Sequence, residues 1–239
     1  MKYELNSLIG QITEADCEEV LAQLPDKCVD LVLTDPPYGI GAGREKPHNG
    51  WIDHGISDWD LSSPSANAFK EIRRVSKNQI VWGGNYFTEH LPPSMCWFFW
   101  DKGQRDFSLA DGELAWSSFN RALRVFSYSR AAALQEGKCH PTQKPVPLFV
   151  WCLMKYSKPG DLVIDPFCGS GTTALACHKT GRRFICIDRE PKYIEIAQQR
   201  YRELVAQTEL FGAGDIESGA TSANTQRDAT PAQGELKLL

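Results

Sequence analysis

The sequence contains no apolar run that approaches the length of a membrane-spanning helix, and its first residues, MKYELNSLIGQ, lack a signal-peptide pattern. Its eight cysteines form no C-x-x-C pair and no tight cluster with histidine, the spacing that zinc sites require. Most of them lie in apolar stretches, as buried thiols do in a reducing compartment. We therefore expect a cytoplasmic protein with free cysteines, no disulfide framework, no metal and no membrane partner.

The sequence also has little excess charge, since 30 acidic and 26 basic residues give a net charge of −4. That charge is unevenly spread, because the residues from 208 onward carry −3 and residues 1–207 carry only −1. Five basic residues face Glu136 alone in the stretch 121–144, namely Arg121, Arg124, Arg130, Lys138 and Lys144. A near-neutral protein with one basic face can bind a phosphate backbone, so a nucleic-acid partner is not excluded.

Apolar runs of strand length alternate with helical patterns, which is typical of a mostly parallel sheet covered by helices on both faces. The expected strands are 8–13, 28–34, 79–82, 95–100, 114–118, 123–127, 161–165 and 183–188, with 114–118 and 123–127 forming an antiparallel hairpin. A first helix is expected from the capping box at Thr13 through Leu24, and a second helix begins at Ser63. Two more helices are expected over 147–157 and over 191–204. We expect one α/β domain of about seven strands over 1–211 and, where periodicity ends, a disordered tail over 212–239.

The first motif is LVLTDPPYGIG, residues 31–41, in which an apolar strand ends in an acid, two prolines and an aromatic residue. Proline has no N–H to donate to a neighbouring strand, so the strand must stop before Pro36. The prolines also hold Asp35 and Tyr38 in one fixed relation. A loop aimed by a rigid strand is a candidate functional site, and a plain surface turn is the alternative.

The second motif is LVIDPFCGSGTTALA, residues 162–176, which predicts a strand, a glycine-rich turn and a helix capped by Thr172 and Thr173. It lacks the lysine of a phosphate-binding P-loop and the third glycine of the dinucleotide fingerprint. The following strand ends at Asp188, 17 positions after Gly171, where an acid can bind the hydroxyls of a nucleotide ribose. A solvated carboxylate capping the helix from Pro191 is the alternative, but together the two features favour a nucleoside cofactor.

These motifs together resemble the S-adenosylmethionine-dependent amino-methyltransferases of DNA. The resemblance is carried by TDPPYG, DPFCGSGTT, IDRE and KCHPTQKP (138–145), and it covers roughly residues 7–205. The catalytic block precedes the cofactor block, as in the branch called beta, which is circularly permuted relative to ordinary methyltransferases. The resemblance implies a doubly wound, mostly parallel, seven-stranded Rossmann-like sheet with one antiparallel strand.

The resemblance implies roles for the DPPY residues Asp35, Pro36, Pro37 and Tyr38. An exocyclic base amine is a poor nucleophile, and the Asp35 carboxylate with the Pro36 carbonyl would accept hydrogen bonds from both of its hydrogens. Tyr38 would stack on the base after it leaves the duplex, with Gly39 leaving room beside the ring.

The resemblance also implies a cofactor site. Asp165, Phe167 and the turn Gly169, Ser170 and Gly171 would hold the methionine part of the cofactor, and Pro166 and Thr172 are further cofactor-binding residues. Asp188 would bind the ribose, and His140, Thr142 and Lys144 would close the far side. Lys144 has an alternative as a basic residue on a phosphate-facing surface.

Two segments are longer than simple connections require, 39–63 and 119–138. We expect the first to close over the flipped base and contact DNA; four of its residues, His48, Asp53, His54 and Asp58, are spaced too loosely for a metal site. The second lies where the family places its target-recognition region. It contains the candidate DNA-binding residues Arg121, Arg124, Arg130 and Lys138, with an ordinary solvated face as the alternative.

The resulting prediction is a DNA adenine-N6 methyltransferase that uses S-adenosylmethionine and acts on double-stranded DNA. Asp35 favours adenine, because relatives acting on the N4 amine of cytosine more often begin this motif with serine. The alternatives are an N4-cytosine methyltransferase, transfer to RNA or to a glutamine amide, and a non-catalytic DNA-binding or regulatory subunit. A homodimer and a cognate restriction enzyme are further partners that the resemblance suggests.

Overall fold

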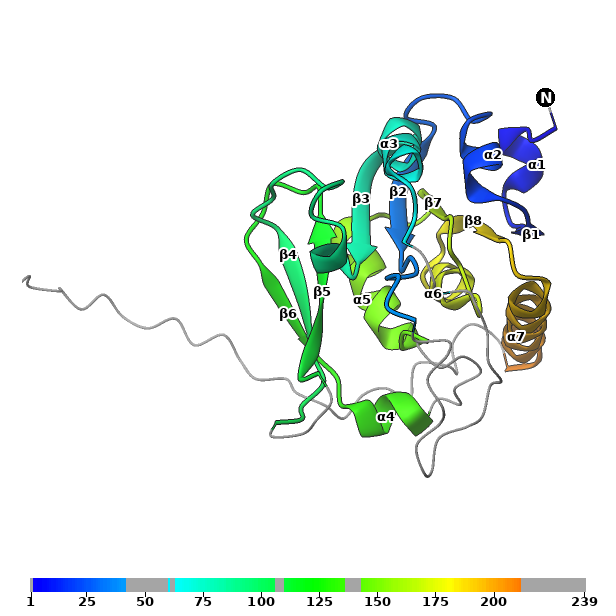
Figure 1. Ribbon diagram of the computed structural model, residues 1–239. Helices are drawn as coiled ribbons and strands as arrows, with labels where there is room; N and C mark the ends of the chain where they lie inside the picture. Colours follow the sequence, from blue (N-terminus) through cyan, green and yellow to red (C-terminus); the bar gives the residue numbers. More distant parts are fainter. Residues whose placement is uncertain (1, 42–59, 61–62, 106–109, 136–142, 212–239) are drawn as a thin grey trace, which may run out of the picture. The chain divides into compact units, whose positions relative to one another are not determined.

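The computed structural model describes residues 2–41, 60, 63–105, 110–135 and 143–211 (Figure 1). The chain divides into two compact units, Met1–Glu203 and Leu204–Leu239. Among the described residues, none of the helices has the length and apolar character that crossing a membrane requires. The tail predicted over 212–239 lies outside the described residues, and a domain spanning 1–211 stays a prediction.

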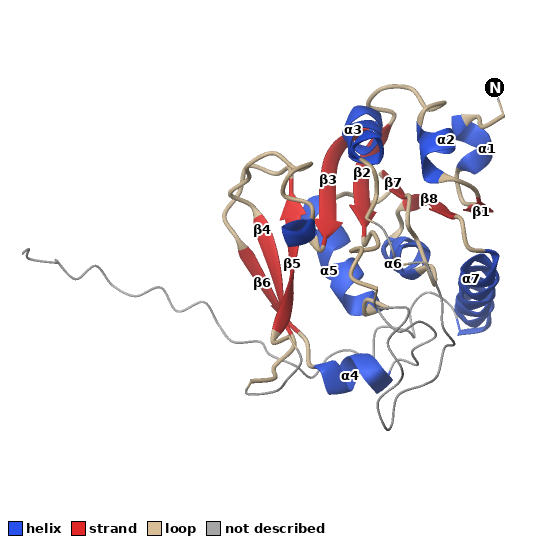
Figure 2. Cartoon of the chain, in the orientation of Figure 1, coloured by secondary structure: helices blue, strands red, loops and turns tan. Residues whose placement is uncertain are grey.

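Eight strands form one sheet in the order β1-β8-β7-β2-β3-β5-β4-β6 (Figure 2). Strand β5 pairs antiparallel with β3 and with β4, while the other neighbours pair in parallel. The α/β class and the single antiparallel strand are therefore confirmed. The strands are β1 (Ile12–Glu14), β2 (Val29–Thr34), β3 (Ser76–Trp82), β4 (Trp97–Asp101), β5 (Gly112–Ser117), β6 (Arg124–Ser127), β7 (Leu162–Asp165) and β8 (Arg183–Asp188).

The antiparallel hairpin predicted from 114–118 and 123–127 is wrong. Strand β5 already pairs with β3 on one side and β4 on the other, so it has no free edge for β6. Strand β6 pairs in parallel with β4 instead and forms the sheet edge. Among the described residues the sheet has eight strands, one for each expected segment, whereas the resemblance implies seven.

The helices differ from the prediction mainly at their ends. A strand was expected to begin at residue 8, but Leu8 is the last residue of helix α1. Helix α2 begins after Asp16, whose Oδ1 accepts a hydrogen bond from Glu18 N at 2.8 Å. Helix α3 begins after Ser65 rather than at Ser63, and α4 was not predicted. The helices are α1 (Leu5–Leu8), α2 (Cys17–Leu21), α3 (Ala66–Val75), α4 (Arg130–Gln135), α5 (Val146–Tyr156), α6 (Thr172–Thr180) and α7 (Pro191–Phe211), with a 3-10 turn η2 (Gly84–Tyr86).

Strand β2 is buried on both of its faces, as expected for the interior of a parallel sheet. Leu31 and Leu33 belong to one apolar cluster, which includes residues of α5 and α6. Val32, which points the other way, belongs to a second cluster with residues of α2 and α3. Helices therefore cover both faces of the sheet, and this rigid strand aims the loop that follows it.

The carboxyl ends of three neighbouring parallel strands carry the sequence motifs. Strand β7 pairs with β2 and with β8, so the residues after Thr34, the DPFCGSG turn and Asp188 meet at one edge of the sheet. The chain winds outward in opposite directions from the border between β7 and β2, through α6 to β8 and through α3 to β3. Ligands of doubly wound folds bind at such a border.

Candidate active site

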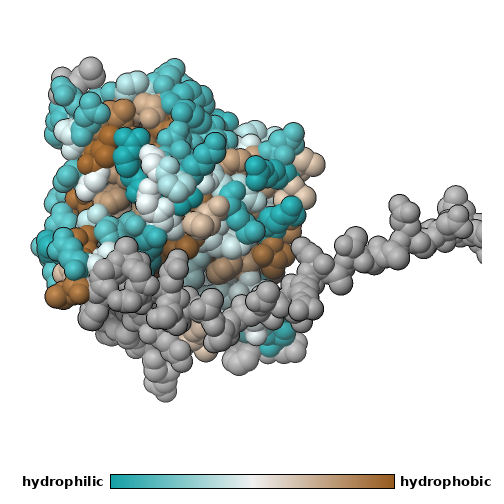
Figure 3. All heavy atoms as spheres, turned by 180° about the vertical axis from the view of Figure 1, so that it is seen from behind, coloured by the Kyte–Doolittle hydropathy of each residue, from teal (hydrophilic) through white to brown (hydrophobic). Residues whose placement is uncertain are grey.

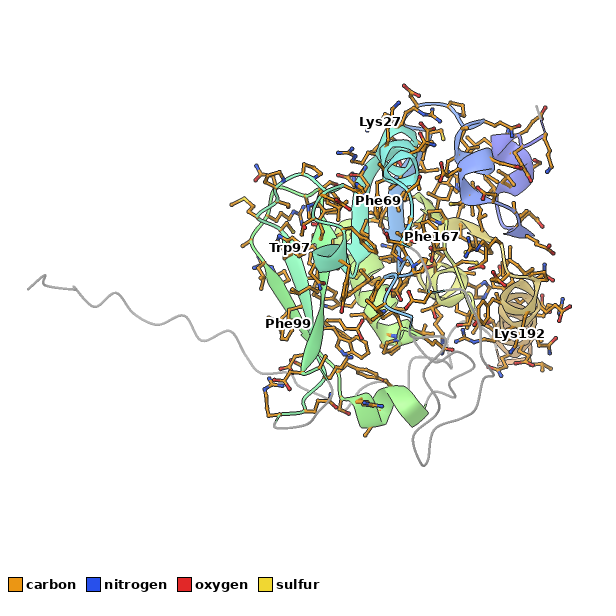
Figure 4. All side chains as sticks on the ribbon, viewed as in Figure 1. Lys27, Phe69, Trp97, Phe99, Phe167 and Lys192 are labelled. Carbon is orange, nitrogen blue, oxygen red and sulfur yellow. The ribbon has the colours of Figure 1, made fainter. Side chains whose placement is uncertain are left out.

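A cavity of about 330 Å³ opens at this edge, within the ~300–1,000 Å³ typical of small-molecule sites. It is lined from the β2, β7 and β8 loops, from the start of α2 and from the segment before α5. Ten of the predicted site residues contribute to the lining: Asp35, Pro37, Lys144, Asp165, Pro166, Phe167, Gly169, Ser170, Thr172 and Asp188. Figure 4 labels Phe167, which lies beside the carboxyl end of β2. Pro36, Tyr38 and Gly171 belong to the same loops without lining the cavity.

The glycine-rich turn is shaped by two left-handed residues. Gly171 has φ of 80°, and a Cβ there would lie 2.7 Å from the Cβ of Ala197, so only glycine allows this approach. Gly169 has φ of 49°, and a Cβ there would meet nothing within 4 Å. The N–H of Gly169 donates a 2.8 Å hydrogen bond to Asp188 Oδ2. The acid at the end of β8 thus fastens the turn that follows β7.

Asp188 also accepts a 3.0 Å hydrogen bond from the N–H of Glu190 through its other oxygen. Burial raises the pKa of Asp188, while these two backbone donors oppose that rise. The carboxylate therefore holds the backbone just before α7 and also lines the cavity, and its predicted contact with a ribose stays a prediction.

Thr172 and Thr173 do not cap helix α6, contrary to the prediction. The N-cap is Gly171, and the two hydroxyls are used elsewhere: Thr173 donates to Asp165 Oδ2 and Thr172 to the carbonyl of Lys144 at 3.3 Å. Asp165 Oδ1 also accepts from the Thr34 hydroxyl at 2.6 Å. Burial raises the pKa of Asp165 to about 7 against these donors, so its charge changes near neutral pH.

The Asp35 carboxylate is held from both sides. Its Oδ1 accepts a hydrogen bond from the Tyr38 hydroxyl at 2.7 Å, and its Oδ2 accepts one from Lys144 Nζ at 2.5 Å. The Lys144 side chain is only 3% exposed, which is incompatible with its alternative as an exposed phosphate-facing residue. Its Nζ also lies 3.0 Å from Glu113 Oε2. Glu113 was not predicted, and its only signal was an isolated acid within the apolar run GELAW.

Tyr38 packs against residues that were not predicted to belong to the site. Its ring stacks on Tyr86 with centroids 4.6 Å apart and planes at 15°, and it meets Phe87 edge-on at 6.0 Å. Gly83, with φ of 68°, would place a Cβ 2.1 Å from Tyr38 Cε1. The glycine pair that follows buried strand β3 was the signal for this close approach.

The predicted DNA-binding residues lie away from the cavity lining. Arg121 places its guanidinium 5.5 Å from the Tyr156 ring centroid, Arg124 begins the edge strand β6, and Arg130 begins α4. Strands β3, β5 and β4 separate β6 from β2. Lys138, His140 and Thr142 lie outside the described residues, so their predicted roles stay predictions.

Little of the segment 39–63 is described, and its ends are joined. Gly39 N donates to Asp60 Oδ1 and Gly41 N to the Asp60 carbonyl, both at 2.9 Å. The residues weighed as metal ligands in this segment lie outside the described part. Within the part that is described, no group of three or more His, Cys, Asp or Glu side chains could hold a metal ion.

Comparison with known proteins gives a family match. The family model N6_N4_Mtase, described as DNA methylase, matches residues 80–199. Among relatives, the type II methyltransferase M.HinfI of Haemophilus influenzae is 29% identical in an alignment that covers 85% of this chain and 71% of that protein.

Solved structures show the same fold. The M1.HpyAVI–SAM complex aligns with a TM-score of 0.54 and 23% identity, over 80% of this chain and 98% of that one. PvuII DNA methyltransferase, which is cytosine-N4-specific, aligns with a TM-score of 0.56 and 18% identity, over 82% and 90%. The methyltransferase type of α/β fold expected from the sequence is thereby confirmed.

Proposed function

Because the chain belongs to the N6_N4_Mtase family of DNA methylases, we propose that it transfers the methyl group of S-adenosylmethionine to the N6 amine of adenine in double-stranded DNA. One observation carries the proposal: the carboxylate of the DPPY loop, the glycine-rich turn and Asp188 all line one cavity. Residues of acceptor chemistry and of cofactor binding therefore share one space.

The residues present fit S-adenosylmethionine, which carries a sulfonium and an ammonium group. Asp165 offers a buried carboxylate and Asp188 a half-buried one to these charges and to the ribose hydroxyls, and Phe167 offers an aromatic surface. Gly169 leaves open space where a side chain would project. When bound there, the cofactor supplies an electrophilic methyl group. Ser170, Thr172 and Lys144 complete the proposed lining.

Asp35 and Pro36 would prepare the target amine. Each carboxylate oxygen can accept two hydrogen bonds, and in the structure each oxygen of Asp35 accepts one from a side chain. Room remains for one hydrogen of the amine, and the Pro36 carbonyl would accept the other. This positions the nitrogen lone pair and stabilises the positive charge that develops on it. Pro37 keeps the two acceptors in a fixed relation.

Tyr38 would stack on the adenine once it has left the duplex, because the amine cannot be reached inside the stacked helix. The Tyr38 hydroxyl is fixed by Asp35, so the stacking surface and the acceptor are positioned by one contact. One face of the ring is occupied by Tyr86 in the structure. A base on that face requires Tyr86 to move aside.

We propose adenine rather than cytosine as the target base because the motif begins with Asp35, where relatives acting on cytosine more often have serine. The cytosine-N4 alternative has the fold likeness to PvuII methyltransferase in its favour. Labelled S-adenosylmethionine, unmethylated DNA and mass spectrometry of the digested nucleosides separate the two. Label on deoxyadenosine supports the proposal, and label on deoxycytidine overturns its substrate. Cofactor binding without labelled DNA would favour the non-catalytic alternative.

We further propose that Arg121, Arg124 and Arg130, with Lys138, contact the DNA backbone or guanine edges. Arg124 is exposed and starts an edge strand, so it is open to a large partner. Replacing one phosphate-contacting arginine should weaken binding across all sequences and reduce the salt slope by about 1, as measured by DNA titration at several salt concentrations. Unchanged salt dependence would contradict a phosphate contact.

The resemblance also supports three proposals about setting. The first is a homodimer, which sedimentation would detect. On the face seen in Figure 3, hydrophobic residues form separate groups among hydrophilic ones. The second is a cognate restriction enzyme, whose cleavage the methylation would block. The third is a cytoplasmic location, supported by free cysteines throughout the described residues.

A further inference from the structure

A row of alternating charges, half-buried except for the buried Lys144, leads away from the cavity. Asp35 Oδ2 lies 2.5 Å from Lys144 Nζ, which lies 3.0 Å from Glu113 Oε2. Glu113 Oε1 in turn lies 2.6 Å from Lys102 Nζ. The Lys144 side chain is 3% exposed, against 16% to 25% for the other three, so it is the innermost member.

The four residues come from separate parts of the chain. Asp35 follows β2, Lys144 precedes α5, Glu113 belongs to β5 and Lys102 follows β4. Removing an ammonium group from water costs several kcal/mol unless opposite charges compensate it. Lys144 meets that requirement with two carboxylates, one from the proposed acceptor loop and one from strand β5 of the same sheet. Its ammonium group is therefore directed at Asp35 rather than at solvent.

We propose that Lys144 is the counter-ion that keeps Asp35 ionised and oriented to accept the target amine, and that Glu113 holds Lys144 in place. This inference rests on the proposed function, because that function gives Asp35 its task. Both residues are positioning residues: Lys144 acts through Asp35, and Glu113 acts through Lys144. Lys144 was predicted as a cofactor residue, and the inference gives it a different principal role.

The physical need for a counter-ion follows from burial. An ionised carboxylate accepts hydrogen bonds with both oxygens, whereas a protonated one would donate with one of them. Burial raises the pKa of Asp35; Lys144 and the Tyr38 hydroxyl oppose the rise, and Glu113 adds to it. Asp165, a further carboxyl group of the cavity, also interacts with Asp35. Lys144 is thus the cation that favours the working form of the acceptor.

Lys144 itself stays charged for the same reason. Burial lowers the pKa of its ammonium group, but Asp35 and Glu113 outweigh that effect and raise the pKa above its ordinary value. The pKa of Glu113 is lowered to about 2, because Lys144 and Lys102 oppose the effect of burial. Lys144 and Glu113 therefore stabilise each other in their charged forms.

The first test is Lys144→Met, which has similar length and no charge. The acidic limb of the kcat–pH profile should move upward by about 1–3 pH units, because Asp35 loses an opposite charge at close range. Lys144→Arg retains the charge and should keep the limb near its wild-type position. Arg74→Met is the matched control: it deprives the poorly exposed Glu71 of its partner, outside the cavity lining, and should leave the limb in place.

A second readout does not depend on activity. Carbon-13 NMR titration of the Asp35 carboxyl, assigned with Asp35→Asn, should show a higher pKa in Lys144→Met than in the wild-type chain without any ligand. If the wild-type chain methylates nothing, the proposed function fails while this titration still decides the counter-ion. Should the methionine variant fail to fold, Lys144→Gln keeps polar contacts without charge and should show the same rise.

One result would contradict the role of Lys144, and another would contradict the role of Glu113. If the titration and the acidic limb stay unchanged while calorimetry shows weaker cofactor binding, Lys144 is a cofactor contact and the inference is wrong. The role of Glu113 has its own test, since Glu113→Gln should lower kcat in the wild-type chain but cause little further loss in Lys144→Met. Independent, multiplying losses would contradict a role through Lys144.

Discussion

At the scale of single residues, carboxylates in the same cavity differ in their surroundings. Asp35 has a cation beside it, whereas Asp165 is buried among hydroxyl and backbone donors, the side chains of Thr34 and Thr173 and the N–H of Phe167. Hydroxyl donors compensate burial less than an ammonium group does, so the pKa of Asp165 reaches about 7. This difference follows from contacts across the fold, and the sequence shows only two aspartates followed by proline.

Binding of S-adenosylmethionine should strengthen as pH rises toward about 7, by up to about tenfold per pH unit, and should level off above about 8. The reason is that Asp165 is largely neutral below a pKa of about 7 and carries its charge above it. Because the pKa of Asp165 lies above its unfolded value of about 3.9, ionising Asp165 without a ligand costs stability as pH rises from about 4 to about 7, and a bound cation offsets that loss. Calorimetry across this range measures the trend. Asp165→Asn should flatten it, and an equal trend in that variant would contradict the assignment.

At the scale of elements, the strands that hold the motifs were predicted more accurately than the neighbouring strands. Strand β8 was predicted at its observed bounds, and β7 and β2 within one residue of theirs, because prolines, glycines and long apolar runs mark their ends. The β5–β6 hairpin was wrong because pairing depends on which strand edges are free. The contact between Asp35 and Lys144 joins residues 109 positions apart, so local pattern could not reveal it.

The glycine turn after β3 offers a prediction at this scale. Gly83→Ala should destabilise the protein by about 1–3 kcal/mol more than Gly10→Ala, because the added methyl group must displace the Tyr38 ring. Both positions have positive φ, but a Cβ at Gly10 would meet nothing within 4 Å, so the control carries only the backbone strain. Urea unfolding of both variants measures the difference. Equal losses would show that Tyr38 is not packed this tightly.

At the scale of the whole molecule, the order of motifs along the chain is less important than their place in the sheet. The acceptor motif precedes the cofactor motif by 130 positions, from Asp35 to Asp165, yet β2 and β7 pair directly. A circular permutation changes which ends are joined and leaves such a pair intact. This is why the resemblance predicted the fold, while the ion row and the Tyr86 stack required the structure.

A chain ending at residue 211 should fold and methylate DNA at the rate of the full chain. The described residues lining the cavity all lie between Ala15 and Tyr193. The segment removed holds four acidic and two basic residues, so its loss should leave DNA affinity equal or slightly higher at low salt. Circular dichroism, labelled-methyl incorporation and DNA titration together test this. Lost activity in a folded truncated chain would contradict the proposed 1–211 domain.

The most direct measurement is single-turnover methylation by Asp35→Asn beside the wild-type chain, with cofactor affinity measured by calorimetry on both. We expect cofactor binding within a few-fold of wild type and a methyl-transfer rate lower by about 10²–10³-fold, since an amide is an uncharged, weaker acceptor and loses the ion pair with Lys144. Transfer at the wild-type rate would show that Asp35 does not position the amine in the cavity where the cofactor binds.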